Sequence, residues 1–82
     1  MTGKPIIHHL DATGLEGPQP ILEVRRALKT ISPEMELEVT TTDPESVPTM
    51  EAFCRMAGHR LMMAERRKSL FIFRIRPGNS GT

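Results

Sequence analysis

Few residues of this chain are able to carry nucleophilic chemistry. Cys54 is the single cysteine, so an internal disulfide and a zinc site built from several cysteines are both excluded. It stands next to Phe53 on the apolar stripe of a helix pattern, where a lone cysteine usually acts as a small buried hydrophobe. We therefore expect Cys54 to be buried, and we keep a reactive Cys54 as the less favoured alternative.

The three histidines do not form a ligand cluster. His8 and His9 are adjacent in a strand pattern and point to opposite faces, so they cannot chelate one ion together. His59 follows Gly58 at the end of a helix pattern, where an imidazolium would interact well with the negative end of the helix dipole. We predict a capping or packing role for His59, no metal site and no cofactor.

Positive charge is concentrated in the second part of the chain. Residues 1–51 carry 4 Lys or Arg against 9 Asp or Glu, whereas residues 52–82 carry 7 against 1. This asymmetry makes five side chains candidates for binding RNA or another polyanion: Arg66, Arg67, Lys68, Arg74 and Arg76. The near-neutral total of +1 favours the alternative, in which solvated charges keep a sheet edge soluble. The absence of Trp and Tyr argues against a base-stacking surface.

The elements that must position these residues can be read from the hydrophobic pattern. It predicts strands at 6–10, 35–42, 61–65 and 70–76, a helix that begins at the prolines 18 and 20, and a second helix that ends at Gly58. A strand–helix–strand unit makes a right-handed crossover between parallel strands, and the last two strands form a hairpin. The order β-α-β-α-β-β thus predicts an α/β two-layer sandwich, a mixed four-stranded sheet with both helices on one face.

Three local features of these elements can be checked. Strand 35–42 alternates, so the face that carries Glu36 and Glu38 is expected to be wet. The start of the second helix is ambiguous, because Pro44 and Pro48 each suit a first turn but hardly both. The last two strands are expected to be joined by the basic turn 66–69.

Length and hydropathy bound the organisation of the chain. Eighty-two residues suffice for one domain, which we expect to span residues 1–77, with 78–82 as a flexible C-terminal tail. No apolar run approaches the roughly 18 residues of a membrane span, and residues 1–10 are too polar for a signal peptide. Together with the single cysteine, this predicts a cytoplasmic protein without a membrane partner.

From Leu10 to about Arg76 the chain resembles the TusA family of small sulfur carriers, also called SirA-like. The matching segments are LDATGL at 10–15, prolines at 18 and 20, LEVRRAL at 22–28, TDP at 42–44, FC at 53–54 and GH at 58–59. The resemblance implies the same β-α-β-α-β-β fold. It also implies a role in a sulfur relay that serves tRNA thiolation, molybdenum-cofactor assembly or sulfur oxidation.

The family carries a Cys-Pro-x-Pro motif at the start of the first helix, and its cysteine accepts sulfane sulfur as a persulfide. A thiol placed there meets unpaired N–H groups and the positive helix end, which favour the reactive thiolate. In this chain the motif reads Gly17-Pro18-Gln19-Pro20, and a glycine cannot hold sulfur. A natural loss of transfer activity and an introduced substitution both fit this departure, and the sequence does not distinguish them.

The resemblance implies a docking loop that would contact a sulfur donor or acceptor protein, either a cysteine desulfurase-like enzyme or a downstream relay protein. Its residues are Asp11, Gly14, Glu16, Gly17, Pro18 and Pro20. Whether the chain is itself a sulfurtransferase stays open, because the motif nucleophile is missing. Two other classes remain alternatives: an RNA-binding module, with tRNA or RNA as a weaker partner, and an interaction domain that uses a sheet edge. We expect a monomer or a weak dimer.

Overall fold

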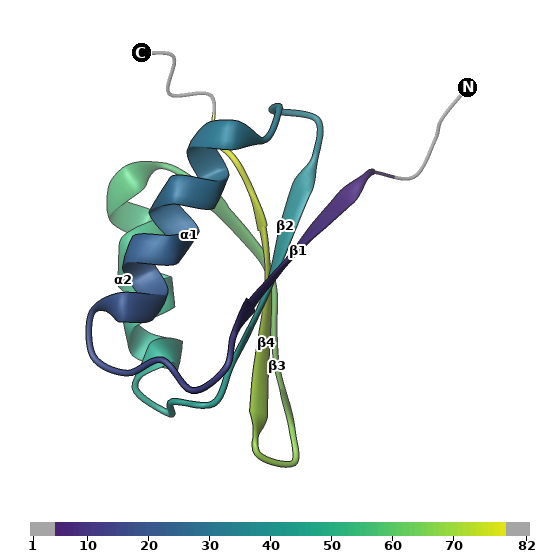
Figure 1. Cartoon of the computed structure of the whole chain (residues 1–82). Helices are drawn as coiled ribbons and strands as arrows, with labels where there is room; N and C mark the ends of the chain where they lie inside the picture. Colours follow the sequence, from purple (N-terminus) through teal and green to yellow (C-terminus); the bar gives the residue numbers. More distant parts are fainter. Residues whose placement is uncertain (1–4, 79–82) are drawn as a thin grey trace.

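The computed structural model describes residues 5–78. The elements are β1 (Ile7–Ala12), α1 (Gln19–Thr30), β2 (Glu36–Thr41), α2 (Ser46–Ala57), β3 (Arg60–Arg67) and β4 (Leu70–Arg76). The strands form one sheet in the order β1-β2-β4-β3, in which β1 and β2 are parallel and the other neighbours antiparallel. Both helices cover one face of this sheet (Figure 1). The predicted two-layer α/β sandwich is confirmed.

Helix α1 begins where its prolines are tolerated. Pro18 is the N-cap residue and Pro20 lies in the first turn, where backbone N–H groups have no partner inside the helix, so the missing donors cost little. Val24 and Leu28 are buried on the side that faces the sheet. These two residues belong to the apolar stripe by which α1 packs on the sheet.

Helix α2 accommodates both of its prolines. Pro44 precedes the N-cap residue Glu45, and Pro48 lies in the first turn, so neither proline removes a hydrogen bond of the helix interior. The helix ends at Gly58, whose φ of 80° is a left-handed conformation that glycine adopts without strain. The His59 N–H then bonds to the Cys54 carbonyl at 2.9 Å. The predicted stop at Gly58 is confirmed.

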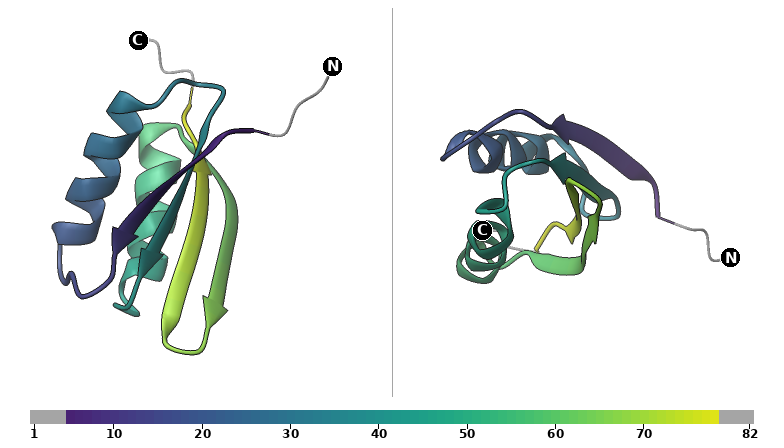
Figure 2. Two further views of the ribbon diagram at one scale, coloured as in Figure 1. Left: turned by 45° about the vertical axis from the view of Figure 1, so that its right-hand side comes forward. Right: turned by 90° about the horizontal axis from the view of Figure 1, so that it is seen from below.

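The core lies between the helices and the two central strands. It contains nine buried apolar residues: Ala12, Val24, Leu28, Leu37, Val39, Met50, Cys54, Phe73 and Ile75. Every second residue of β2 and β4 contributes to it, as the alternation predicts. Figure 2 shows the helices packed against the concave side of the twisted sheet.

The opposite sheet face is less wet than predicted. Glu36 is only 4% exposed, because Arg74 and Arg76 of the neighbouring strand β4 lie over it. Arg76 Nη2 donates to Glu36 Oε2 at 2.8 Å, and Arg74 Nη2 donates to Glu38 Oε1 at 2.8 Å. His9 Nδ1 lies 3.6 Å from Glu38 Oε2. The expectation of a solvated Glu36 is wrong because the β2–β4 register places arginines beside it.

The ends of β1 and β3 differ from the predictions. β1 continues to Ala12, which is fully buried, so the strand ends two residues later than expected. Arg66 and Arg67 belong to β3 and pair with Phe71 and Leu70, which leaves only residues 68–69 in the turn. Residues 79–82 of the predicted tail lie outside the described residues, whereas Gly78 donates its N–H to His59 Nδ1 at 2.9 Å. Within residues 5–78, no helix is long and apolar enough to cross a membrane.

Candidate functional site

The loop between β1 and α1 carries the motif residues and is fastened at several points. The Leu15 N–H bonds to the Ala12 carbonyl at 3.3 Å, and the Gln19 N–H bonds to the Glu16 carbonyl at 3.2 Å. The Gly14 N–H donates to Thr42 Oγ1 at 2.9 Å, across to the loop that follows β2. These bonds fix the path of the chain into α1.

Gly17 occupies the motif position just before the helix. Its φ is +62°, in the left-handed region that favours glycine, and it is exposed. A Cβ built on this residue would have no heavy atom within 4 Å. The position therefore offers space for a side chain, while its backbone conformation disfavours every residue that has one.

A small cleft of about 310 Å³ adjoins Gly17. It is lined by Gly14, Leu15, Glu16, Gly17, Thr42, Asp43 and Pro44. Its side chains include two carboxylates and a hydroxyl but no thiol, imidazole or amine. The cleft thus lies beside the N-terminus of α1, and its lining has no thiol that could hold sulfur.

The second wall of the cleft is the β2–α2 loop, which our sequence reasoning did not include in the site. Asp43 Oδ1 accepts the Glu45 N–H at 3.0 Å, and the Asp43 carbonyl accepts the Ser46 hydroxyl at 2.6 Å. Thr41 Oγ1 and Ser46 Oγ are also hydrogen-bonded at 2.6 Å. The predicted topology could have indicated this second wall. β1 and β2 are parallel neighbours, so the loops that follow their carboxyl ends lie together at one edge of the sheet.

Asp11 shapes the start of the motif loop. Its Oδ1 accepts the Thr13 hydroxyl at 2.7 Å and the Thr13 backbone N–H at 3.0 Å. The Thr13 hydroxyl, and then its N–H, hold the pKa of the Asp11 carboxyl below its usual value. Asp11 thus has a local role, because it accepts a hydroxyl and a backbone N–H within the loop.

Comparison with known proteins decides the family. The family model described as "Sulfurtransferase TusA" matches residues 8–77. This chain belongs to the TusA family. It is 39% identical over 67 residues to the sulfur carrier protein TusA of Allochromatium vinosum, covering 82% of this chain and 88% of that protein. It is 34% identical over 67 residues to the sulfur carrier protein TusA of Pseudomonas syringae pv. tomato, covering 82% and 80%.

A third relative is also described as a sulfur carrier. The chain is 40% identical over 62 residues to a putative sulfur carrier protein of Neisseria meningitidis serogroup A, covering 76% of this chain and 84% of that protein. The resemblance stated from the motifs is thereby confirmed. That Gly17 stands at the position of the family's motif cysteine stays a prediction from the resemblance.

Cys54 is the remaining thiol in this TusA-family chain, and it is buried as expected. Cys54 is 2% exposed and lies in the core. Burial raises the pKa of the Cys54 thiol to about 11, because the apolar surroundings disfavour the charged form. At neutral pH the group is therefore a protonated thiol, which does not attack sulfur.

His59 anchors the chain after β4 and does not act as a charged cap. Its Nδ1 accepts the Gly78 N–H, and its ring lies 5.5 Å from the Phe53 ring between centroids. Burial lowers the pKa of the His59 imidazole, so the neutral form is favoured. The predicted packing role is confirmed, and both the lowered pKa and the bond from the Gly78 N–H favour the neutral ring. Among residues 5–78, no group of three or more His, Cys, Asp or Glu could hold a metal ion.

The structure distributes the five polyanion candidates over different surroundings. Arg74 and Arg76 are paired with Glu38 and Glu36. Arg67 Nε lies 3.2 Å from an oxygen of Glu65. In Arg66, Nε donates to the Lys68 carbonyl at 3.2 Å, and the guanidinium lies 5.9 Å from the centre of the Phe71 ring. Polyanion binding by this set stays a prediction, and much of its charge is already compensated by carboxylates.

Proposed function

We propose that this TusA-family protein acts in a sulfur relay by docking to a sulfur donor or acceptor protein, without carrying a persulfide itself. Two observations support the proposal. The cleft at the mouth of α1 is built, yet its motif position holds Gly17, which has no atom to bond sulfur. The single cysteine, Cys54, is buried in the core, and burial raises the pKa of its thiol.

The docking surface in this proposal is the motif loop together with the β2–α2 loop. Gly14, Glu16, Gly17 and Pro18 are exposed, so a partner has access to them. Hydrogen bonds already fix both loops, and little conformational entropy is lost when a partner binds such a preorganised surface. Such a protein would bind a relay enzyme at the site that a sulfur carrier uses, and it would not accept the sulfur.

We also propose that this role belongs to the cytoplasm. An unpaired, unoxidised cysteine is typical of a reducing compartment, and Cys54 is a free thiol. A cysteine desulfurase that works in the same compartment is the donor we would test first, since such an enzyme generates the sulfane sulfur that a relay passes on.

The sulfur-carrying half of the proposal is tested by mass. The chain is incubated with a cysteine desulfurase and cysteine, and the intact protein is weighed before and after reduction. The wild-type chain is expected to gain no sulfur. The Gly17→Cys variant restores the motif thiol in an open position and is expected to gain one reducible sulfur atom, also when Cys54→Ala is added. A reducible sulfur on the wild-type chain would overturn the non-carrying role.

The docking half is tested by binding of the wild-type chain to the immobilised desulfurase. A Glu16→Arg variant changes the charge at the cleft and should weaken binding about tenfold or more, as expected for a contact at the centre of an interface. Glu51→Arg makes the same charge change on an exposed site of α2 and serves as the control. Equal effects of both variants, or no binding of the wild-type chain to desulfurases or relay acceptors, would contradict docking through this loop.

A further inference from the structure

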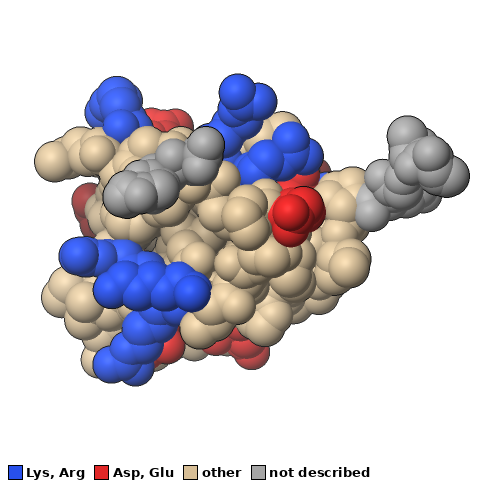
Figure 3. Space-filling model, turned by 90° about the horizontal axis from the view of Figure 1, so that it is seen from above, with Lys and Arg blue, Asp and Glu red and all other residues tan. Residues whose placement is uncertain are grey.

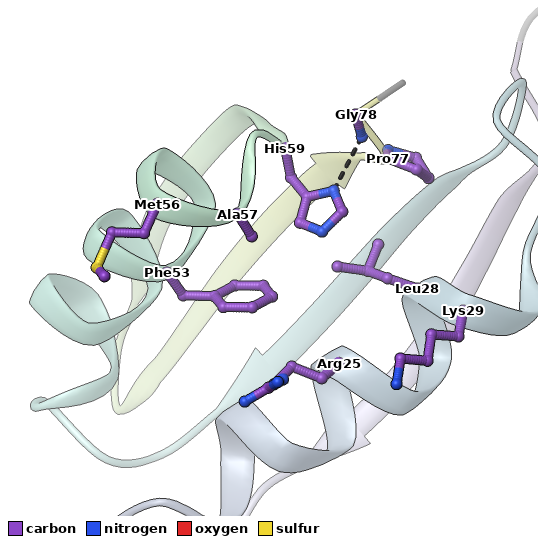
Figure 4. A pocket seen from close by; sticks show the side chains of 9 residues that line it. All are labelled: Arg25, Leu28, Lys29, Phe53, Met56, Ala57, His59, Pro77 and Gly78. Carbon is purple, nitrogen blue, oxygen red and sulfur yellow. Dashed lines mark hydrogen bonds between the residues drawn. The ribbon is translucent and has the colours of Figure 1, made fainter. Parts of the chain in front are cut away.

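A second and larger hollow lies between the C-terminal halves of α1 and α2. Its volume is about 580 Å³, within the range of small-molecule sites. Nine residues line it: Arg25, Leu28, Lys29, Phe53, Met56, Ala57, His59, Pro77 and Gly78 (Figure 4). None of them belongs to the cleft beside Gly17, which lies at the opposite end of the helices.

The floor of this hollow is apolar. Leu28 of α1 and Phe53 and Ala57 of α2 face one another across it, and Pro77 closes the upper end (Figure 4). Met56 lies at the rim and is 85% exposed. Apolar surface of this kind gains free energy when a ligand removes it from water.

The polar part of the hollow is cationic. Arg25 and Lys29 are four residues apart on one side of α1 and border it (Figure 4). Both are exposed, and no carboxylate of residues 5–78 lies within 4.0 Å of either side chain. Figure 3 shows this end of the molecule, with several Lys and Arg side chains on it. The two charges are thus free to meet a ligand.

His59 adds a third donor. Its Nδ1 accepts the Gly78 N–H, which requires a lone pair on that nitrogen and places the ring proton on Nε2. The Nε2 side of the ring faces the space between the helices (Figure 4). No aspartate or glutamate is among the residues that line the hollow. Its polar side chains are therefore all donors, and they suit an anionic group.

We propose that this hollow binds an amphipathic anion, namely a medium-chain carboxylate. The hydrocarbon chain lies against Leu28, Phe53 and Pro77. The carboxylate meets Arg25 and Lys29, which outweigh the weaker negative field of the helix C-termini. One outward carbonyl of α2, that of Cys54, is already bonded to the His59 N–H and does not compete. This site is independent of the proposed sulfur-relay role.

The test uses anilinonaphthalene sulfonate, a dye that fluoresces in apolar sites and carries one negative charge. The chain has no Trp or Tyr, so its own fluorescence does not interfere. We expect saturable binding of one dye per chain and displacement by decanoate below its micelle concentration. Decanol, which has the same chain without the charge, should displace the dye at least tenfold less well.

Variants locate the site. The double variant Arg25→Gln/Lys29→Gln should weaken decanoate binding about tenfold or more, since two charge-assisted contacts are lost. Arg26→Gln is the matched control, because Arg26 is on the same helix, does not line the hollow and pairs with Glu23. Circular dichroism verifies that each variant is folded. Gly17→Cys should bind decanoate like the wild-type chain.

Four outcomes would overturn the proposal. The first two are the absence of saturable dye binding and equal displacement of the dye by decanol and decanoate. The third is an unchanged decanoate affinity of the double variant. The fourth is a set of NMR amide shifts on decanoate addition that map to the sheet face opposite the helices. None of these outcomes affects the sulfur-transfer assay, so a failure here is distinguishable from a failure of the proposed function.

Discussion

The Gly78 backbone N–H donates to Nδ1 of His59 at 2.9 Å, so the second residue after β4 is tied to the second residue after α2. The two backbones approach closely at this point. A Cβ on Gly78 would lie 1.8 Å from the Gly58 carbonyl oxygen, so only glycine fits. Phe53 packs on the other side of the imidazole. The His59–Gly78 hydrogen bond therefore joins the C-terminal end of α2 to the C-terminal end of β4.

The His59–Gly78 contact predicts a pH dependence of stability. A protonated Nδ1 cannot accept the Gly78 N–H, and burial lowers the pKa of His59 in the folded protein below its unfolded value near 6.5. Between these two values the unfolded chain binds more protons, so stability rises with pH. The contribution is complete above pH 6.5 and is lost as the pH falls toward the folded pKa.

Urea denaturation at pH 5 and pH 7.5 measures this effect. The loss of unfolding free energy between the two pH values should be smaller in His59→Gln than in the wild-type chain. His8→Gln, at an exposed strand position, is the control and should retain the wild-type pH difference. An unchanged pH difference in His59→Gln would refute the role assigned to His59.

Gly17 predicts a stability cost for any side chain at the motif position. Gly17→Ala meets no steric obstacle but must hold φ near +62°, which costs about 1 kcal/mol. In a domain of this size the melting temperature should fall by roughly 4–8 °C. Gly17→Asn should lose less, because Asn tolerates the left-handed region. Equal melting temperatures for the wild-type chain and Gly17→Ala would show that the backbone relaxes here.

Much of the fold could be predicted because its signals are local. The alternation of Leu37 and Val39, and of Phe73 and Ile75, identifies strands with one covered face, and Gly58 identifies a helix end. The burial of Glu36 could not be predicted in this way. It depends on the β2–β4 register, which places Arg74 beside Glu38 and brings Arg76 within reach of Glu36.

The candidate site was predictable only in part, for the same reason. The motif loop could be found from Gly17, Pro18 and Pro20 because these residues are neighbours in the sequence. The second wall, with Thr42 and Asp43, comes from the β2–α2 loop, and the Gly14–Thr42 hydrogen bond that joins it to the motif loop spans 28 positions of the chain. For His59 the sequence indicates a capping or packing role, but the burial that lowers the pKa of its ring depends on contacts with residues distant in the chain.

The ion pairs of Glu36 with Arg74 and Arg76 lead us to expect that the sheet face opposite the helices contributes to stability. Glu36→Gln keeps the shape of the side chain but removes the charge that Arg76 contacts at 2.8 Å, and it should cost about 1–2 kcal/mol of unfolding free energy. This expected loss of unfolding free energy is smaller than for a fully buried ion pair, because Arg74 and Arg76 are partly exposed. Glu38→Gln, at a more exposed site, should cost less. Urea denaturation measures both; a larger loss for Glu38→Gln would contradict this order.

RNA binding by the basic hairpin can be separated from the docking role by its salt dependence. Because Arg74, Arg76 and Arg67 are paired with glutamates, few free cations remain to displace counterions from a phosphate backbone. We expect any binding to tRNA to be weak and to be lost between 50 and about 200 mM salt, as phosphate contacts are. Lys68→Gln should reduce it and Lys29→Gln should not. Tight binding that persists at the higher salt would instead favour the RNA-binding alternative.

Cys54 predicts slow modification of the native protein. With a pKa of about 11, roughly one thiol in 1,000 is a thiolate at pH 8, and the residue is 2% exposed. Labelling by a disulfide reagent should therefore be at least ~100-fold slower in the native chain than in urea. The Gly17→Cys/Cys54→Ala variant supplies the comparison, because its thiol is at the open mouth of α1 and should react rapidly without denaturant. If native Cys54 reacts as fast as that thiol, the core is open at α2, and Cys54 again becomes a candidate sulfur carrier.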